Sequence, residues 1–164
     1  MKAMALAIRR YLPSDLDAVI AIYQSAIREV SARDYSPAQI AAWSHADRDD
    51  WAPHRLSRPA WIAEIDGVPA GFTDLEDDGH LDMMFVHARF QGRGVATALL
   101  RQVEAAAREA GLSRIFTEAS ITARPFFLSR GFELIAEQTV ECEGQWLTNF
   151  RMHKRLGRDQ NSFI

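Results

Sequence analysis

The stretch that decides the fold is MFVHARFQGRGVATALL, residues 84–100. It predicts an apolar strand that leads through Gln-Gly-Arg-Gly into a helix. The first turn of a helix presents unpaired backbone N–H groups and the positive end of the helix dipole. Glycines just before that turn let the backbone approach an anion of about diphosphate size. A tight turn without any ligand is the alternative that the glycines alone leave open.

The segments before this stretch predict one strand and two helices. Residues 5–11 alternate loosely and predict a first strand. A helix follows, with Ser14 as its N-cap. A short second helix starts with a capping box, because Gln39 stands three residues after Ser36. Residues 44–59 are polar and predict a loop or a short helix.

The middle of the chain predicts antiparallel strands joined by tight turns. AWIAEID (60–66) and PAGFTDLE (69–76) flank an Asp-Gly pair, which is a strong hairpin signal. A second Asp-Gly turn leads to HLDMMFV (80–86), which predicts a strand. The chain then continues with a helix over 94–110 ended by Gly111, a strand over 113–119, a short helix over 123–131, a hairpin of 132–142 with 145–156, and a loose tail over 157–164. This order predicts one domain, 1–164, with a mixed α/β sheet.

The bulk properties exclude several classes of protein. A chain of 164 residues and 18.5 kDa predicts one domain with one good-sized core. The net charge of −3 and a pI near 5.9 argue against a nucleic-acid binder. No apolar run is long enough for a membrane helix, and the N-terminus does not look like a signal peptide. We therefore expect a cytoplasmic monomer or homodimer with no membrane or nucleic-acid partner.

Two nucleotide-binding alternatives can be compared with the glycine turn. A P-loop requires a lysine that the turn lacks. A dinucleotide fingerprint is closer, since Gly92 and Gly94 form Gly-x-Gly and Glu118 stands at about the distance of a ribose ligand. However, Thr97 replaces the third glycine, and the preceding strands form hairpins rather than a parallel half-sheet. The dinucleotide interpretation stays open as a minor alternative.

The turn carries a family resemblance. FVHARFQGRGVATALL resembles the central motif of the GCN5-related N-acetyltransferase (GNAT) superfamily, Gln/Arg-x-x-Gly-x-Gly/Ala, with Gln91, Gly94 and Ala96 in the three positions. ASITARPFFLSRGF (119–132) resembles a later pattern of the same family. The resemblance covers about residues 61–156. The segment YSPAQIAAW is similar to that of a poorly characterised bacterial subgroup.

This resemblance implies an acetyl-CoA-dependent N-acetyltransferase that moves an acetyl group directly to a primary amine of a small molecule or protein. It also implies a mixed, mostly antiparallel central sheet with helices on both faces. The pyrophosphate of acetyl-CoA is expected on backbone N–H groups of the turn and on the Thr97 hydroxyl, and the pantetheine arm between splayed strands. The residues implied at the cosubstrate are Phe85, Val86, Gln91, Gly92, Arg93, Gly94, Val95, Ala96, Thr97, Ser120, Phe126 and Phe127.

The family commonly places its base near the positions of His80 and Asp82. Asp82 is the preferred candidate, because apolar neighbours favour a carboxylate that takes up a proton, and His80 is the second. Phe127 departs from the family, in which a tyrosine at this place is thought to protonate the CoA thiolate. A non-catalytic acyl-CoA sensor is therefore the rival hypothesis.

Other chemistry-bearing residues have weaker expectations. His80 and Asp82 resemble a metal pair, but the sequence supports no third ligand and we expect no metal. Cys142 is expected to be a passive strand residue. The wall for the acceptor amine is expected to include Tyr35, Trp43, Trp51 and Trp146. Attraction of a cationic amine by acidic residues is weighed against simple solvation, which we favour, for Asp47, Asp49, Asp50, Asp74 and Glu76.

Overall fold

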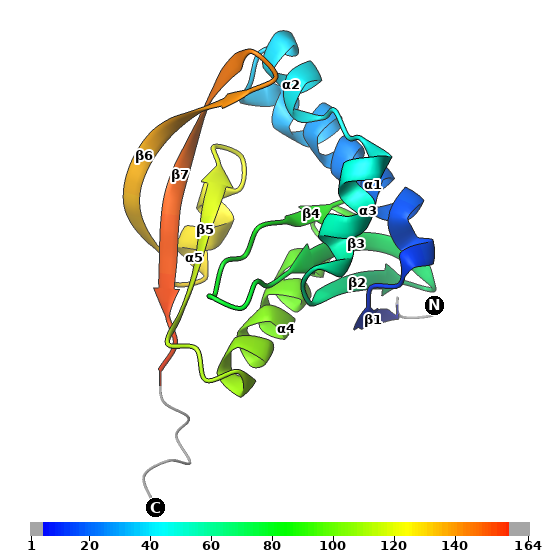
Figure 1. Cartoon of the computed structure of the whole chain (residues 1–164), viewed down its shortest axis with the longest axis vertical. Helices are drawn as coiled ribbons and strands as arrows, with labels where there is room; N and C mark the ends of the chain where they lie inside the picture. The colour runs from blue at the N-terminus through cyan, green and yellow to red at the C-terminus, as the bar shows by residue number, and fades with distance from the viewer. Residues whose placement is uncertain (1–4, 158–164) are drawn as a thin grey trace, which may run out of the picture.

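The computed structural model describes residues 5–157; the predicted tail beyond Gly157 lies outside the described residues. Its strands form two sheets, in which every paired strand is antiparallel (Figure 1). The first sheet has the order β1 (Leu6–Arg10), β2 (Ala60–Ile65), β3 (Val68–Asp74) and β4 (Met84–Val86). The second has the order β5 (Arg114–Ser120), β7 (Gln145–Arg155) and β6 (Glu133–Cys142).

Helices cover both faces of the first sheet, so the predicted mixed α/β class is confirmed (Figure 1). The helices are α1 (Leu16–Ser25), α2 (Pro37–Trp43), α3 (Arg48–Leu56), α4 (Val95–Glu109) and α5 (Arg124–Ser129). A π-helical turn, Ala26–Val30, extends α1, and 3₁₀ turns lie at Pro13–Asp15, Ser31–Arg33 and Ala88–Phe90. Between residues 5 and 157, none of the helices combines the length and hydropathy that crossing a bilayer requires.

The two predicted helix starts near the N-terminus have different outcomes. The capping box of α2 is confirmed, since Ser36 Oγ accepts from Gln39 N and the Gln39 side chain accepts from Ser36 N. Ser14 is not the N-cap of α1; that position is Asp15, after a 3₁₀ turn. Asp15 accepts from Leu12 N at 2.8 Å and pairs with Arg9, so this carboxylate fixes the entry into the helix.

Successive side chains of the first sheet point to opposite faces, and each face packs against a different helix. Ile62 and Phe72 pack with the apolar side of α1. Their neighbours on the opposite face pack with Val95 and Leu99 of α4. Gly71 belongs to the α4 face, where an added Cβ would lie 2.9 Å from both the Phe85 carbonyl oxygen and Val95 Cγ1. A side chain is therefore excluded where α4 begins.

The central sheet divides between β4 and β5. Up to Leu81 the chain follows β5: Leu81 N donates to Phe116 O at 2.9 Å, and a parallel bridge joins His80 to Phe116. Beyond Leu81, Asp74 Oδ1 accepts from the backbone N–H groups of Asp82 and Met83, at 2.9 and 3.0 Å. The prediction of a strand over 80–86 is therefore wrong for 80–83. His80 and Leu81 contact β5 instead of β3, and the buried Asp74 carboxylate takes the N–H groups of Asp82 and Met83 that a ladder would use.

A buried ion pair holds this carboxylate in place. Asp74 is completely buried, and Arg55 Nη1 donates to its Oδ2 at 2.9 Å. Arg55 is itself 3% exposed and comes from α3, so residues 44–59 contain a full helix whose last turn carries the partner charge. The interpretation of Asp74 as a solvated loop residue is wrong for this reason.

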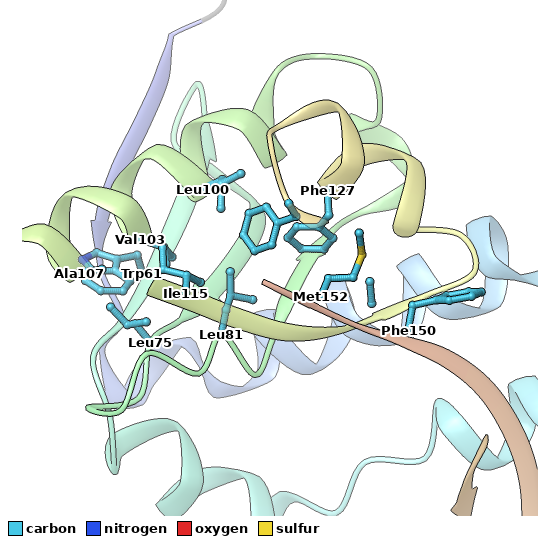
Figure 2. Close-up of a cluster of buried hydrophobic side chains, with 12 residues drawn as sticks. Trp61, Leu75, Leu81, Leu100, Val103, Ala107, Ile115, Phe127, Phe150 and Met152 are labelled. Atoms are coloured by element: carbon cyan, nitrogen blue, oxygen red, sulfur yellow. The ribbon is translucent and has the colours of Figure 1, made fainter. Parts of the chain in front are cut away.

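One apolar cluster joins the two sheets (Figure 2). It combines Trp61 of β2, Leu100 and Val103 of α4, and Met152 of β7. Phe127 of α5 points into the same cluster (Figure 2). The buried side of α4 consists of Val95, Leu99, Leu100, Val103 and Ala107. The sheets thus separate at β4 while sharing one core on the α4 side.

Candidate functional site

The glycine turn before α4 has the geometry that an anion site needs. Gly92 and Gly94 have φ angles of +73° and +78°, a region that side chains disfavour. A Cβ at either position would meet no atom within 4 Å, so the glycines serve the backbone conformation and not the packing of the protein. Gly94 is the N-cap of α4, and no side chain caps the helix. The helix N-terminus therefore faces open space.

That space belongs to a cavity of about 410 Å³, which we call the turn cavity. It runs from the turn along β4 to α5. All the residues implied at the cosubstrate line it except Arg93: Phe85, Val86, Gln91, Gly92, Gly94, Val95, Ala96, Thr97, Ser120, Phe126 and Phe127. The guanidinium of Arg93 lies over the Phe90 ring instead, 5.6 Å from its centroid.

Some wall residues of the turn cavity could not be named from the motif. Trp43 reaches it from the end of α2, a segment far away in the sequence. Arg130 Nη2 donates to Thr97 Oγ1 at 2.7 Å and so adds a cation beside the start of α4. Arg130 directly precedes Gly131 in the sequence, and this position was the signal that could have indicated it. Trp43 reaches the cavity only through the packing of α2, which the sequence does not show.

The split of the sheet exposes one backbone edge of β4 to the turn cavity. His87 N donates to Ala70 O on β3 at 2.8 Å. Because neighbouring residues of a strand point in opposite directions, the N–H of Val86 faces the gap toward β5. The Val86 carbonyl on that edge accepts from Gln91 Nε2 at 2.8 Å. The motif glutamine thus ties the turn to the end of β4.

Phe127 combines a core position with a place on the cavity wall. Its side chain is 4% exposed, and its ring contacts Phe126 and Phe132 with centroids 5.4 and 5.0 Å apart. The ring provides no proton donor where the related motif has a tyrosine. Tyr23 and Tyr35 are bonded elsewhere: the hydroxyl of Tyr23 donates to Trp43 O and that of Tyr35 to Thr148 O.

A second cavity of about 270 Å³ adjoins the first, and we call it the aromatic cavity. The two cavities share Trp43, Phe85 and Ser120. Residues found only in the aromatic cavity are Tyr23, Tyr35, Asp82, Met83, Glu118, Val140, Cys142, Leu147, Thr148 and Asn149. Two ligands, one in each cavity, would therefore meet at the shared wall.

Asp82 lines the aromatic cavity, but its surroundings are not the apolar ones that we expected. Arg58 Nη1 donates to Asp82 Oδ2 at 3.1 Å, and Arg55 Nη2 lies 3.7 Å from the same oxygen. The Asp82 side chain is 37% exposed. Two arginines therefore balance the charge of this carboxylate, while solvent and ligands can still reach it.

Glu118 is a second carboxylate in the aromatic cavity, and sequence analysis noted it only as a possible ribose ligand. His80 contacts Glu118, with Nε2 2.7 Å from Glu118 Oε2, while Nδ1 lies 2.9 Å from Glu76 Oε1. These hydrogen bonds, that to Glu118 most strongly, raise the pKa of His80 to about 9. At neutral pH His80 is therefore an imidazolium between two carboxylates.

Glu76 completes a cluster that the sequence did not indicate. Its oxygen, a nitrogen of His80 and an oxygen of Asp82 all lie within 4.8 Å of one another, so a third potential metal ligand does exist. Arg58 Nη1 lies 2.8 Å from Glu76 and 3.1 Å from Asp82. The guanidinium already bridges the two carboxylates, and the cluster has the chemistry of an ion-pair network.

The expected acceptor wall is only partly assembled. Tyr35 and Trp43 line the aromatic cavity, whereas Trp51 packs in the core against Tyr23 and Trp146 is 60% exposed. Asp47 caps α3 by accepting from Asp49 N, which is a structural role. Cys142 lies on the cavity wall, where burial raises its pKa and so disfavours the thiolate.

These features define a class of protein. An uncapped helix N-terminus in front of an exposed strand edge suits an extended ligand that carries phosphate groups, and the adjoining cavity suits a smaller partner. The antiparallel strands before the turn do not fit the dinucleotide alternative, which requires a parallel half-sheet. Glu118 also hydrogen-bonds to His80 and lines the aromatic cavity, which is not the role expected of a ribose ligand.

Comparison with known proteins gives the family. Residues 31–156 match the family described as "Acetyltransferase (GNAT) domain". A protein of Escherichia coli (strain K12), "Uncharacterized N-acetyltransferase YafP", is 38% identical over 145 residues, covering 88% of this chain and 93% of that protein. The chain therefore belongs to the GNAT family of N-acetyltransferases, and the resemblance of its two motifs is confirmed.

Solved structures agree in fold. A GCN5-related N-acetyltransferase from Rhodopseudomonas palustris is 36% identical, with a TM-score of 0.91, covering 95% of this chain and 99% of that one. The PaiA N-acetyltransferase from Thermoplasma acidophilum, solved in complex with coenzyme A, is 17% identical, with a TM-score of 0.73 and coverage of 93% and 100%. At that identity the second likeness shows the fold alone.

Proposed function

We propose that this chain transfers the acetyl group of acetyl-CoA directly to a primary amine. The observation that carries the proposal is the pair of adjoining cavities, of which one begins at the glycine turn and the other contains two carboxylates. Structures of this fold have been solved with coenzyme A and with acetyl-CoA, which supports the cosubstrate. A sensor that only binds acyl-CoA would have no need of the second cavity.

Each end of acetyl-CoA has matching groups in the turn cavity. The pyrophosphate would accept from backbone N–H groups of Gln91 to Ala96, helped by the dipole of α4 and by the Arg130–Thr97 pair. The pantetheine arm would lie in the gap beside β4. There the Val86 N–H would polarise the thioester carbonyl and stabilise the oxyanion that forms on it.

The acceptor amine must lose a proton before or as it attacks the thioester carbon. Asp82 and Glu118 are the candidate bases, because both reach the cavity that adjoins the thioester position. His80 was the second candidate, but its raised pKa leaves it protonated at neutral pH, so we assign it the positioning of Glu118. Solvent would protonate the leaving thiolate, since Phe127 offers no proton.

Titration with acetyl-CoA tests the cosubstrate site. Gly94→Glu places a bulky negative group at the proposed pyrophosphate position and should abolish calorimetrically detected binding. Gly67→Glu is the matched control, since Gly67 also has a positive φ of +81° and open space around it, but lies in the β2–β3 turn. If the wild type does not bind acetyl-CoA, or if Gly94→Glu binds it as well as Gly67→Glu does, the site is only a turn.

Turnover tests the bases. Free-thiol release with an amine panel should fall by about 10²-fold or more in Glu118→Gln or Asp82→Asn, whichever removes the base. Acetyl-CoA affinity should change little in either variant. A wild-type protein that binds acetyl-CoA but releases no thiol with any amine would favour the sensor.

A further inference from the structure

We infer that the acceptor is a small arylalkylamine, that is, a protonated amine on a short stem with a flat apolar body and no carboxylate beside the nitrogen. This inference rests on the proposed function and narrows its substrate class. The size, the charge and the aromatic wall of the aromatic cavity each support it separately.

The size favours a small molecule. The cavity measures about 270 Å³, which is at the lower limit of the 300–1,000 Å³ that is typical of sites for drug-sized ligands. It lies between the first sheet and the β6–β7 hairpin, whose upper end reaches α2 (Figure 1). A ligand with one ring and a two-carbon stem matches such a space better than a long polyamine.

The charge favours a cation without a neighbouring carboxylate. Among the residues of 5–157 that line the cavity, two are acidic, Asp82 and Glu118, and none is Lys, Arg or His. The nearby cations are bonded to carboxylates: Arg58 to Glu76 and Asp82, and His80 to Glu76 and Glu118. An ammonium would thus find two carboxylates as hydrogen-bond partners, whereas the carboxylate of an amino acid would find no cationic side chain among the described lining residues.

Part of the cavity wall is aromatic and preorganised. The ring centroids of Tyr23 and Phe85 lie 4.9 Å apart, those of Tyr35 and Trp43 5.3 Å, and those of Trp43 and Phe85 6.3 Å. Both tyrosine hydroxyls donate to backbone carbonyls, which fixes these rings. A flat apolar body can pack on such edge-to-face rings with little loss of conformational entropy in the protein.

Asn149 is a further polar residue of the cavity wall. Its Oδ1 is buried and has no hydrogen-bond partner within residues 5–157, although it belongs to the cavity wall. Buried acceptors of this kind are normally satisfied, so an N–H donor of a bound ligand is a suitable partner. An arylalkylammonium has up to three such donors, enough for both carboxylates and this amide.

The experiment compares 2-phenylethylamine with three other acceptors: one lacks the ring, one adds a carboxylate and one is a peptide. With acetyl-CoA we expect kcat/KM for 2-phenylethylamine to exceed that for n-butylamine at least about 10-fold, because the ring body is buried. It should exceed that for phenylalanine at least about 100-fold, because the added carboxylate lies beside Asp82 and Glu118 and finds no cationic partner on the described wall. A short peptide with a free N-terminal alanine should be the poorest. Equal rates for phenylalanine and 2-phenylethylamine, or preference for the peptide, would overturn the inference.

Direct binding separates this inference from the proposed function. Calorimetry with 2-phenylethylamine should give at least about 10-fold weaker affinity for Glu118→Gln, since a charge-assisted contact is lost, and unchanged affinity for Glu137→Gln, an exposed carboxylate on β6 outside both cavities. Failure of acetyl-CoA binding would sink the proposed function alone. An amine that does not bind, or binds all three proteins equally, would sink the acceptor class alone.

Discussion

His80 lies between two carboxylates, and its hydrogen bonds decide its charge. Glu118 and Glu76 accept from its two ring nitrogens at 2.7 and 2.9 Å, and its ring stacks on Phe116 with centroids 5.0 Å apart. Since both nitrogens have acceptors, the doubly protonated ring satisfies both contacts. This residue is therefore suited to orient Glu118 rather than to take the proton of the amine.

The pKa of His80 has a consequence for stability. In the folded protein it is raised to about 9 from an ordinary 6.5, so the imidazolium stabilises the fold fully below pH 6.5 and loses this effect as the pH rises through 9. We expect His80→Gln to lower the free energy of unfolding by at most roughly 3 kcal/mol at pH 6, at about 1.4 kcal/mol per pKa unit. Urea unfolding should show this difference shrinking by pH 9.5, and a difference independent of pH would contradict the assignment.

At the scale of residues, the sequence predicts the turn better than the carboxylates. Gly92 and Gly94 predict a positive-φ turn and the start of a helix directly after it. Both features depend on residues close in the sequence, so the sequence alone can predict them. Glu118 and His80 are 38 positions apart, and their contact exists only because residues 79–81 run along β5. The family resemblance therefore indicated His80 and Asp82, but the sequence does not show which side chains they contact.

At the scale of elements, the short β4 depends on the Arg55–Asp74 pair. Asp74→Asn would remove the nearest counter-ion of the buried Arg55 and leave it the more distant Asp82, at 3.7 Å. Removing one partner of such a buried pair costs about 3–5 kcal/mol. We expect urea unfolding to show a loss of this size, and Asp77→Asn, in the exposed turn nearby, to be nearly neutral. A loss of unfolding free energy below about 1 kcal/mol would mean that the Arg55–Asp74 pair does not stabilise the separation of β4 from β5.

The packing of α4 on the first sheet depends on Gly71. A Cβ there would meet the Phe85 carbonyl and Val95 Cγ1 at 2.9 Å and Leu99 Cδ1 at 3.1 Å, and the carbonyl belongs to backbone that cannot move freely. We expect Gly71→Ala to destabilise the fold by about 1–3 kcal/mol, as overpacked cores do. Because Val95 is the first residue of α4, acetyl-CoA affinity should fall as well. Unchanged stability and affinity would show that the helix shifts without consequence.

The elements themselves were predicted where a local signal exists. The Asp66-Gly67 and Glu143-Gly144 turns have the positive φ angles that two-residue hairpins require, and both hairpins were expected. The strand over 80–83 was wrongly predicted from a real alternation, because His80 and Leu81 contact β5 and Asp74 takes the N–H groups of Asp82 and Met83. Likewise Asp15 replaces Ser14 as the N-cap because Arg9 on β1 holds its carboxylate.

At the scale of the whole molecule, the two sheets share one core, and the segment before β4 is bridged to β5 at His80–Phe116. The cluster that contains Trp61, Leu100 and Met152 connects β2, α4 and β7 (Figure 2). A single shared core predicts one cooperative unfolding transition. Fluorescence, which reports on the tryptophans, and far-ultraviolet circular dichroism should therefore give coincident urea curves. Separate midpoints for the two probes would show that the sheets unfold independently.

The same architecture predicts how acetyl-CoA acts on the whole fold. A ligand in the turn cavity would contact β4, α4 and α5, and so connect the two sheets across their gap. At 100 times its Kd it should stabilise the folded protein by about 2.7 kcal/mol, which for a chain of this size raises the Tm by roughly 5–10 °C. Gly94→Glu should show no such rise at the same concentration, whereas Gly67→Glu should retain it. If acetyl-CoA binds without raising the Tm, it must bind the unfolded chain as well as the folded one, and the gap between β4 and β5 would not be its site.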